Sequence, residues 1–191
     1  MAGAGPGLAA TDADNTLPEF PMYDAHDQTA QGQDKLTELI KDIKFAMFTA
    51  RHDDGQLHSR PMTTQNNPSE RGGVLWFFMS RSGQPVADLE EHPEVNVTYA
   101  DPGKDSYVSI SGAARVVEDL ERKKAMWNTF AQAWFPGGPT DPDLALVAVL
   151  IAEAEYWDVK SNQAVQLFKM AKAAVTGKPP KDMGEHRRVR M

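Results

Sequence analysis

The run Val74–Met79 constrains the fold more than any other stretch of the sequence, because all of its residues are apolar. Ser80 and Gly83 end the run, so its length is typical of a strand and too short for a helix. A strand without polar alternation is typical of burial on both faces. The chain is therefore expected to contain a sheet with a well-covered interior.

Further strands are predicted on both sides of this run. Phe45–Ala50 and Gln56–Gln65 are separated by Asp53-Asp54-Gly55, which is a hairpin signal because glycine tolerates a positive φ. The other predicted strands are Val95–Ala100, Ser106–Val117 and Leu144–Val159, with a turn at Asp101-Pro102-Gly103. Within the second of these, Gly112 indicates a bulge or a close approach of another backbone.

Helical spacing of apolar residues is confined to four segments, which are Gln33–Lys44, Gln84–Glu91, Leu120–Trp134 and Ala164–Val175. Strands and helices alternate too sparsely for a doubly wound parallel sheet, and the Gly-x-Gly-x-x-Gly and Walker patterns are absent. The prediction is a mostly β fold, a six-stranded antiparallel barrel with flanking helices.

Composition narrows the classes of partner. A formal net charge of -7 argues against nucleic acid, and no apolar run is long enough to span a membrane. The chain has no cysteine, which excludes disulfides and thiolate chemistry. We expect a cytoplasmic protein with a flexible N-terminal arm at residues 1–30, one domain at 31–177 and a solvated basic C-terminal tail at 178–191.

Six stretches, taken in order, resemble one known family. They are Ser59-Arg60-Pro61-Met62, Leu75–Ser80, Asp88–Val97, Ser109–Ala114, Trp134–Gly138 and Glu155–Asp158. In this order they are similar to the pyridoxamine-phosphate-oxidase-like split-barrel flavoproteins, and closest to the branch of general stress protein 26. The resemblance covers about residues 33 to 177.

The resemblance implies a split β-barrel that binds FMN, with FAD or a deazaflavin as the alternative ligand. It also implies a homodimer with a flavin at each interface. The residues that it assigns to the cofactor are Ser59, Arg60, Pro61, Met62, Phe77, Phe78, Met79, Ser80, Arg81, Ser82, Gln84, Tyr107, Trp134, Phe135 and Trp157.

The phosphate of FMN needs guanidinium, hydroxyl or main-chain N–H donors. Arg60 is the first candidate, and a solvated strand arginine is the alternative interpretation. Ser80–Gln84 opens a helix, where anions are favoured, although serine also caps helices without any ligand. The lysine that commonly follows this strand in the family is replaced by Pro85. Arg81, Gln84 or Lys160 are the candidates to compensate.

For the ring, we expect main-chain groups of Phe77–Met79 to be more important than their side chains, half of which should pack in the core. Trp134, Phe135, Trp157 and Tyr107 are expected either at a partner's flavin or in ordinary packing. The predicted chemistry is that of an oxidoreductase, and no catalytic acid or base is nominated. Glu185–Arg188 resembles the substrate motif of true pyridoxamine-phosphate oxidases only superficially, so that activity is not expected.

Three alternatives stay open. The chain could be a non-catalytic flavin carrier or stress-related sensor, a flavoprotein for another flavin, or a barrel without a cofactor. The histidines lie far apart in sequence and form no His-Glu-x-x-His motif, so no metal site is expected.

Overall fold

The computed structural model describes residues 30–65, 73–158 and 185–190. Three predictions fall outside the described residues. They concern most of the N-terminal arm, the helix Ala164–Val175 and Lys160. The helices are α1 (Ala30–Ile40), α2 (Gln84–Glu91), α3 (Leu120–Met126) and α4 (Thr129–Trp134). The strands are β1 (Ala46–Arg51), β2 (Leu57–Met62), β3 (Val74–Ser80), β4 (Glu94–Asp101), β5 (Ser106–Val117), β6 (Leu144–Asp158) and β7 (Glu185–Arg190).

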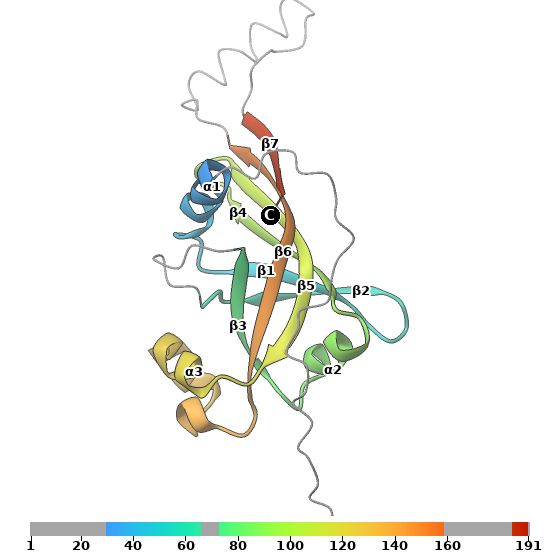
Figure 1. Cartoon of the computed structure of the whole chain (residues 1–191), viewed down its shortest axis with the longest axis vertical. Helices are drawn as coiled ribbons and strands as arrows, with labels where there is room; N and C mark the ends of the chain where they lie inside the picture. Colours follow the sequence, from blue (N-terminus) through green and yellow to red (C-terminus); the bar gives the residue numbers. More distant parts are fainter. Residues whose placement is uncertain (1–29, 66–72, 159–184, 191) are drawn as a thin grey trace, which may run out of the picture.

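All paired strands form one antiparallel sheet with the order β2-β1-β4-β5-β6-β3, and β7 adds to β6 (Figure 1). The sheet curls so that β2 and β3, its two end strands, approach each other. The expected mostly β fold with flanking helices is confirmed. None of the described helices has the length and apolar character needed to cross a membrane.

The inner face of the curled sheet holds the main core. Phe48, Phe77 and Ile110 are at most 1% exposed there, and the rings of Phe48 and Phe77 meet edge to face at 5.3 Å. A second, smaller core cluster lies on the other side of β3 and includes Phe78 and Leu146 with residues of α4. These two clusters explain why the sequence of β3 is apolar without alternation.

Gly112 is a bulge, as predicted from the sequence. The register between β5 and β6 shifts between Ser111 and Gly112. A Cβ atom on Gly112 would lie 2.1 Å from the carbonyl oxygen of Leu150, so no side chain fits at this crossing. The bulge lets the long strands β5 and β6 bend around the core.

Two expectations about the elements are wrong. The single helix predicted over Leu120–Trp134 is two helices, because the Asn128 side chain accepts the N–H groups of Phe130 and Ala131 and starts α4 anew. The C-terminal end is not a solvated tail, since Glu185–Arg190 is a strand. Arg188 and Arg190 face Glu153 of β6, and Val189 is buried, so this charged strand is held by ion pairs and by one apolar contact.

Candidate functional site

The site is built around the split between β2 and β3. Among the described residues, one isolated antiparallel bridge crosses the split, between Thr64, just after β2, and Phe77 of β3. Beside it, the Gln65 N–H donates to the Trp76 carbonyl at 2.8 Å. Thr64 also shares a hydrogen bond of 2.6 Å with the buried Tyr99 hydroxyl. The bridge thus places the end of the predicted cofactor segment Ser59–Met62 near the start of the segment Phe77–Ser80.

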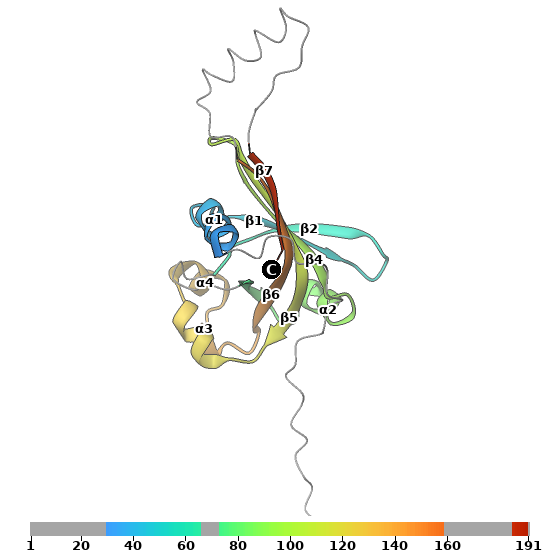
Figure 2. The same ribbon diagram turned by 45° about the horizontal axis from the view of Figure 1, so that its top comes forward.

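β2 is an end strand that projects from the body of the barrel with β1 (Figure 2). Its side chains alternate as predicted, so that Ser59 and Pro61 are exposed while Arg60 and Met62 are half-buried on the opposite side. The Ser59 hydroxyl is hydrogen-bonded to Thr49 of β1 at 2.7 Å.

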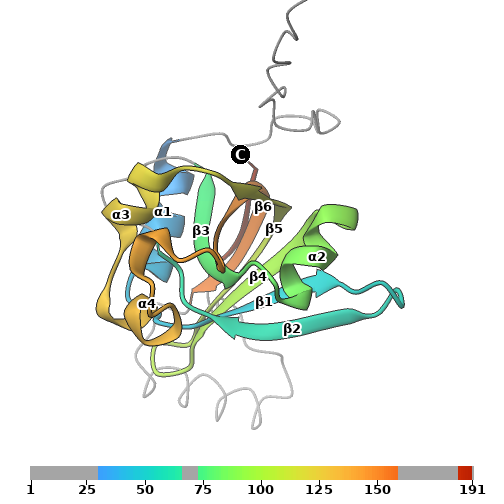
Figure 3. The same ribbon diagram turned by 90° about the horizontal axis from the view of Figure 1, so that it is seen from below.

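Arg60 points toward α2, which lies beside β1 and β2 (Figure 3). Its Nη2 atom is 4.0 Å from Oδ2 of Asp88, a carboxylate with no exposed surface. Gln84 donates from Nε2 to the other oxygen of Asp88 at 2.9 Å. Two of the predicted phosphate ligands therefore face the same buried carboxylate.

The side chains of Phe77, Phe78 and Met79 are all buried. The expectation that half of this strand's side chains would face a ligand is wrong for these three residues, because the core covers one face and the cluster under α4 covers the other. What remains for a ligand in this stretch is the main chain along the edge that faces the split.

The loop after β3 is fastened to the start of β6. The Ser80 hydroxyl donates to Asp143 Oδ2 at 2.6 Å, and the Ser82 N–H donates to Oδ1 at 2.8 Å. Arg81 N–H donates to the Asp143 carbonyl at 2.6 Å. Hydrogen bonds lower the pKa of Asp143. The largest contribution comes from the Ser80 hydroxyl, and smaller ones come from Ser82. This carboxylate is therefore ionised at neutral pH.

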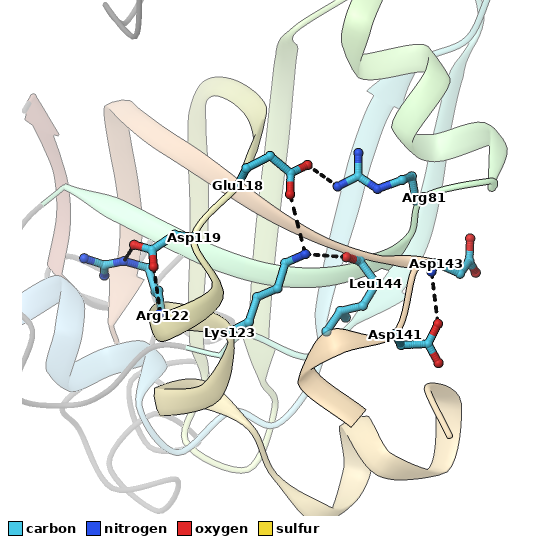
Figure 4. Close-up of polar contacts among 8 residues, drawn as sticks. All are labelled: Arg81, Glu118, Asp119, Arg122, Lys123, Asp141, Asp143 and Leu144. Atoms are coloured by element: carbon cyan, nitrogen blue, oxygen red, sulfur yellow. Dashed lines mark hydrogen bonds and ion pairs between the residues drawn. The ribbon is translucent and has the colours of Figure 1, made fainter. Parts of the chain in front are cut away.

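A cavity of about 390 Å³ lies beside this loop, between α3, the short 3-10 helix Gly138–Thr140 and the start of β6. Figure 4 shows the polar contacts of residues in this region. Arg81 forms an ion pair with Glu118 at its wall. Lys123, only 8% exposed, donates to the Leu144 carbonyl at 2.7 Å and lies 3.7 Å from Glu118. Acidic and basic groups are thus matched within the wall of this cavity.

The predicted aromatic residues are not brought together. Trp134 is 81% exposed on α4, whereas Phe135 is buried in the second core cluster. Tyr107 and Trp157 lie directly opposite each other on β5 and β6, and both are partly exposed on the outer face of the sheet. Only this last pair offers a continuous aromatic surface.

Sequence analysis missed the acidic partners of the site. The contact between Asp88 and Gln84 could have been predicted, since the two residues are one helical turn apart. The contacts of Asp143 and Glu118 could not, because their partners are far away in the chain. It also missed that potential metal ligands of His52, Asp53 and Asp88 lie within 4.8 Å of one another. The guanidinium of Arg60, 4.0 Å from Asp88, already places a positive charge beside this group. The expectation of no metal site stays a prediction.

Comparison with known proteins decides the family. The family model described as "Pyridoxamine 5'-phosphate oxidase like" matches residues 31–181. The chain belongs to this family. Its fold is accordingly the split barrel of that superfamily, and within it the chain falls in the branch of general stress protein 26.

The relatives agree with this family. Protein bli-3 of Neurospora crassa is 27% identical over 190 residues, which is 92% of this chain and 90% of that protein. A structure assigned to general stress protein 26 from Jannaschia sp. CCS1 is 26% identical, with a TM-score of 0.68, over 85% of this chain and all of the other. The general stress FMN/FAD binding protein from Xanthomonas citri is 34% identical, with a TM-score of 0.60, over 70% of this chain and 93% of the other.

Proposed function

We propose that this member of the pyridoxamine 5'-phosphate oxidase-like family binds a flavin at the split between β2 and β3. The observation that carries the proposal is the bridge at this split between Thr64, which follows Ser59–Met62, and Phe77, the first residue of Phe77–Ser80. It stands in a chain 34% identical to a protein that binds FMN or FAD. FMN is the form that the family resemblance favours, and FAD is the alternative.

Main-chain groups suit the flavin ring, because the ring presents several hydrogen-bond acceptors along one edge and flat apolar faces. The edge of β3 offers such groups at the split, where Phe78 and Met79 lie one and two residues beyond the bridged Phe77. The exposed Pro61 and the half-buried Met62 add apolar surface on β2.

A bound flavin supplies electron transfer, so the proposed chemistry is that of an oxidoreductase in the cytoplasm. The protein's part is to hold and orient the ring. The second candidate is a flavin carrier or a stress-related sensor without turnover. It is favoured by the ion pairs of Arg81 and Lys123 with Glu118, which leave these two cations less available to a substrate.

We further propose that the protein is a homodimer. Tyr107 and Trp157 form an aromatic pair on the outer face of the sheet, and Met47 is 42% exposed on the same sheet. Burial of such a surface against a second copy would remove it from water.

The test of flavin binding is a titration of the purified protein into riboflavin, FMN or FAD. We expect quenching of flavin fluorescence with a saturable curve, together with visible absorbance that stays with the protein on gel filtration. Reduction of the bound flavin by NADH or NADPH would then separate an oxidoreductase from a carrier. Absence of saturable quenching with all three flavins would contradict the proposal and favour a barrel without a cofactor.

A further inference from the structure

The polar groups predicted to hold the flavin phosphate already face carboxylates of the same chain. Ser80 and Ser82 donate to Asp143, Arg81 pairs with Glu118, and Arg60 and Gln84 face Asp88. Pro85 stands where the family commonly has a phosphate-binding lysine, and proline offers neither a charge nor an N–H donor. The donors of the loop are therefore satisfied from within the chain, whereas Nη1 of Arg60 is buried and has no hydrogen-bond partner among the described residues.

Asp143 occupies the position that an anion would need at the loop. Its two oxygens accept one hydrogen bond each from Ser80 and Ser82, as two oxygens of a phosphate would. These bonds favour the ionised carboxylate, which is consistent with the lowered pKa of Asp143. A phosphate approaching the same donors would have to compete with this carboxylate and would be repelled by it.

The local charge balance points the same way. The loop and the adjacent cavity carry two cationic side chains, Arg81 and Lys123, against three anionic ones, which are Glu118, Asp141 and Asp143 (Figure 4). A phosphate monoester brings a further charge of about -1.5 to -2 at neutral pH. Groups of like sign a few ångströms apart repel each other, so this site does not attract a phosphate.

We infer that the site recognises the flavin through its ring and not through its phosphate, and that Asp143 is the residue that sets this selectivity. The inference rests on the proposed flavin binding. It names the ligand class as flavins in general. The ribityl chain of such a flavin ends in a hydroxyl in riboflavin, in a phosphate in FMN and in an adenosine diphosphate in FAD. It thereby differs from the expectation, drawn from the sequence, that Arg60 and Ser80–Gln84 select FMN.

The experiment compares riboflavin with FMN on the full chain. For the wild type, we expect dissociation constants within about threefold of each other, because the donors of the loop are already paired and the unpartnered Nη1 of Arg60 is buried. Asp143→Asn keeps the shape and an acceptor for Ser82 but removes the charge. We expect it to raise FMN affinity about five- to tenfold and to leave riboflavin affinity unchanged.

Glu118→Gln serves as a second variant, because it frees Arg81 without touching the link between Asp143 and the loop. It should also raise FMN affinity selectively. Glu121→Gln is the matched control, since Glu121 is an exposed acid on α3 that forms an ion pair with Lys124. It should change neither affinity.

Three outcomes would count against the inference in different ways. A wild type that prefers FMN over riboflavin by tenfold or more would overturn it and leave the proposed flavin binding intact. Equal effects of Asp143→Asn on riboflavin and FMN would show that Asp143 acts on the fold of the loop. If the wild type binds no flavin at all, the proposed function fails and the inference fails with it.

Discussion

At the scale of single residues, the molecule is organised by buried polar groups whose partners come from distant parts of the chain. Tyr99 of β4 is 2% exposed, and its hydroxyl meets Thr64, which follows β2. Asp88 of α2 is fully buried and meets Arg60 of β2. Both contacts fasten the strand that borders the split, so these residues position the candidate site without belonging to the predicted cofactor set.

Tyr99 gives a prediction about alkaline pH. Burial raises the pKa of Tyr99 to about 12, and the hydrogen bond with Thr64 lowers it by a smaller amount. An unfolded tyrosine ionises near pH 10, so between about pH 10 and 12 the unfolded state releases a proton that the folded state retains. Stability from this group is complete below pH 10 and is lost as pH rises through that window, by about 1 kcal/mol at pH 11.

Tyr99→Phe separates the two contributions of the hydroxyl. At pH 8 the variant should be less stable than the wild type by about 1 kcal/mol, because Thr64 loses its partner. At pH 11 the difference should nearly vanish, since phenylalanine does not titrate. Urea unfolding at both pH values measures this, and a difference that is the same at pH 8 and pH 11 would contradict it.

The site shows what a sequence can and cannot give at this scale. The alternation of Ser59, Arg60 and Met62 followed from strand geometry, and the structure has that alternation. The partners of the loop did not follow, because Ser80 and Asp143 are 63 positions apart and only the pairing of β3 with β6 brings them together. Charge compensation of this kind is a property of the folded chain.

At the scale of elements, strands were predicted well where apolar runs end at turn residues. The hairpin at Gly55 and the bulge at Gly112 each depend on a glycine whose backbone or missing side chain is needed. The break between α3 and α4 was missed because apolar spacing continues across it, although Asn128 is a strong capping residue. β7 was missed because Glu185–Arg190 is almost entirely charged, and its ion pairs with Glu153 and Glu155 of β6 come from a distant part of the chain.

The bulge at Gly112 gives a prediction at this scale. In Gly112→Ala the new methyl group would meet the Leu150 carbonyl oxygen, which belongs to a strand paired with β3 and β5 on its two edges and cannot move away easily. We expect a loss of about 2–4 kcal/mol in the free energy of unfolding.

Gly103→Ala is the control for this substitution, since its methyl group would lie 3.3 Å from a side-chain oxygen of Asp101 in an exposed turn. It should cost less than about 0.5 kcal/mol. Chemical unfolding of both variants tests the comparison. If the two substitutions cost the same, β5 and β6 do not cross as closely at Gly112 as the structure has them.

At the scale of the whole molecule, the barrel presents two different surfaces. One is the split with its self-compensated charges, and the other is the outer face of the sheet, where Tyr107 and Trp157 lie opposite each other. The partly exposed aromatic pair has buried neighbours on the other face of the sheet, which are Ser106, Val108 and Tyr156, so it is held rigidly in place. Rigid, partly exposed aromatic groups are typical of protein interfaces.

The proposed dimer therefore gives the last prediction. We expect the protein to sediment at twice the 21.0 kDa of one chain at micromolar concentration. Tyr107→Lys should weaken dimerisation by at least about tenfold, because an interface would bury the new charge without a partner. Phe130→Lys places the same charge at an exposed apolar residue of α4 and should leave the dimer intact.

Flavin titration of the same two variants connects the dimer to the site. If the partner subunit completes the flavin site, Tyr107→Lys should weaken flavin binding in step with dimerisation, and raising the protein concentration should restore it. Flavin affinity that is independent of protein concentration would instead place the whole site within one chain. A wild type that sediments as a monomer at every concentration would exclude the shared site, because the ring would then have to be bound by β2 and β3 alone.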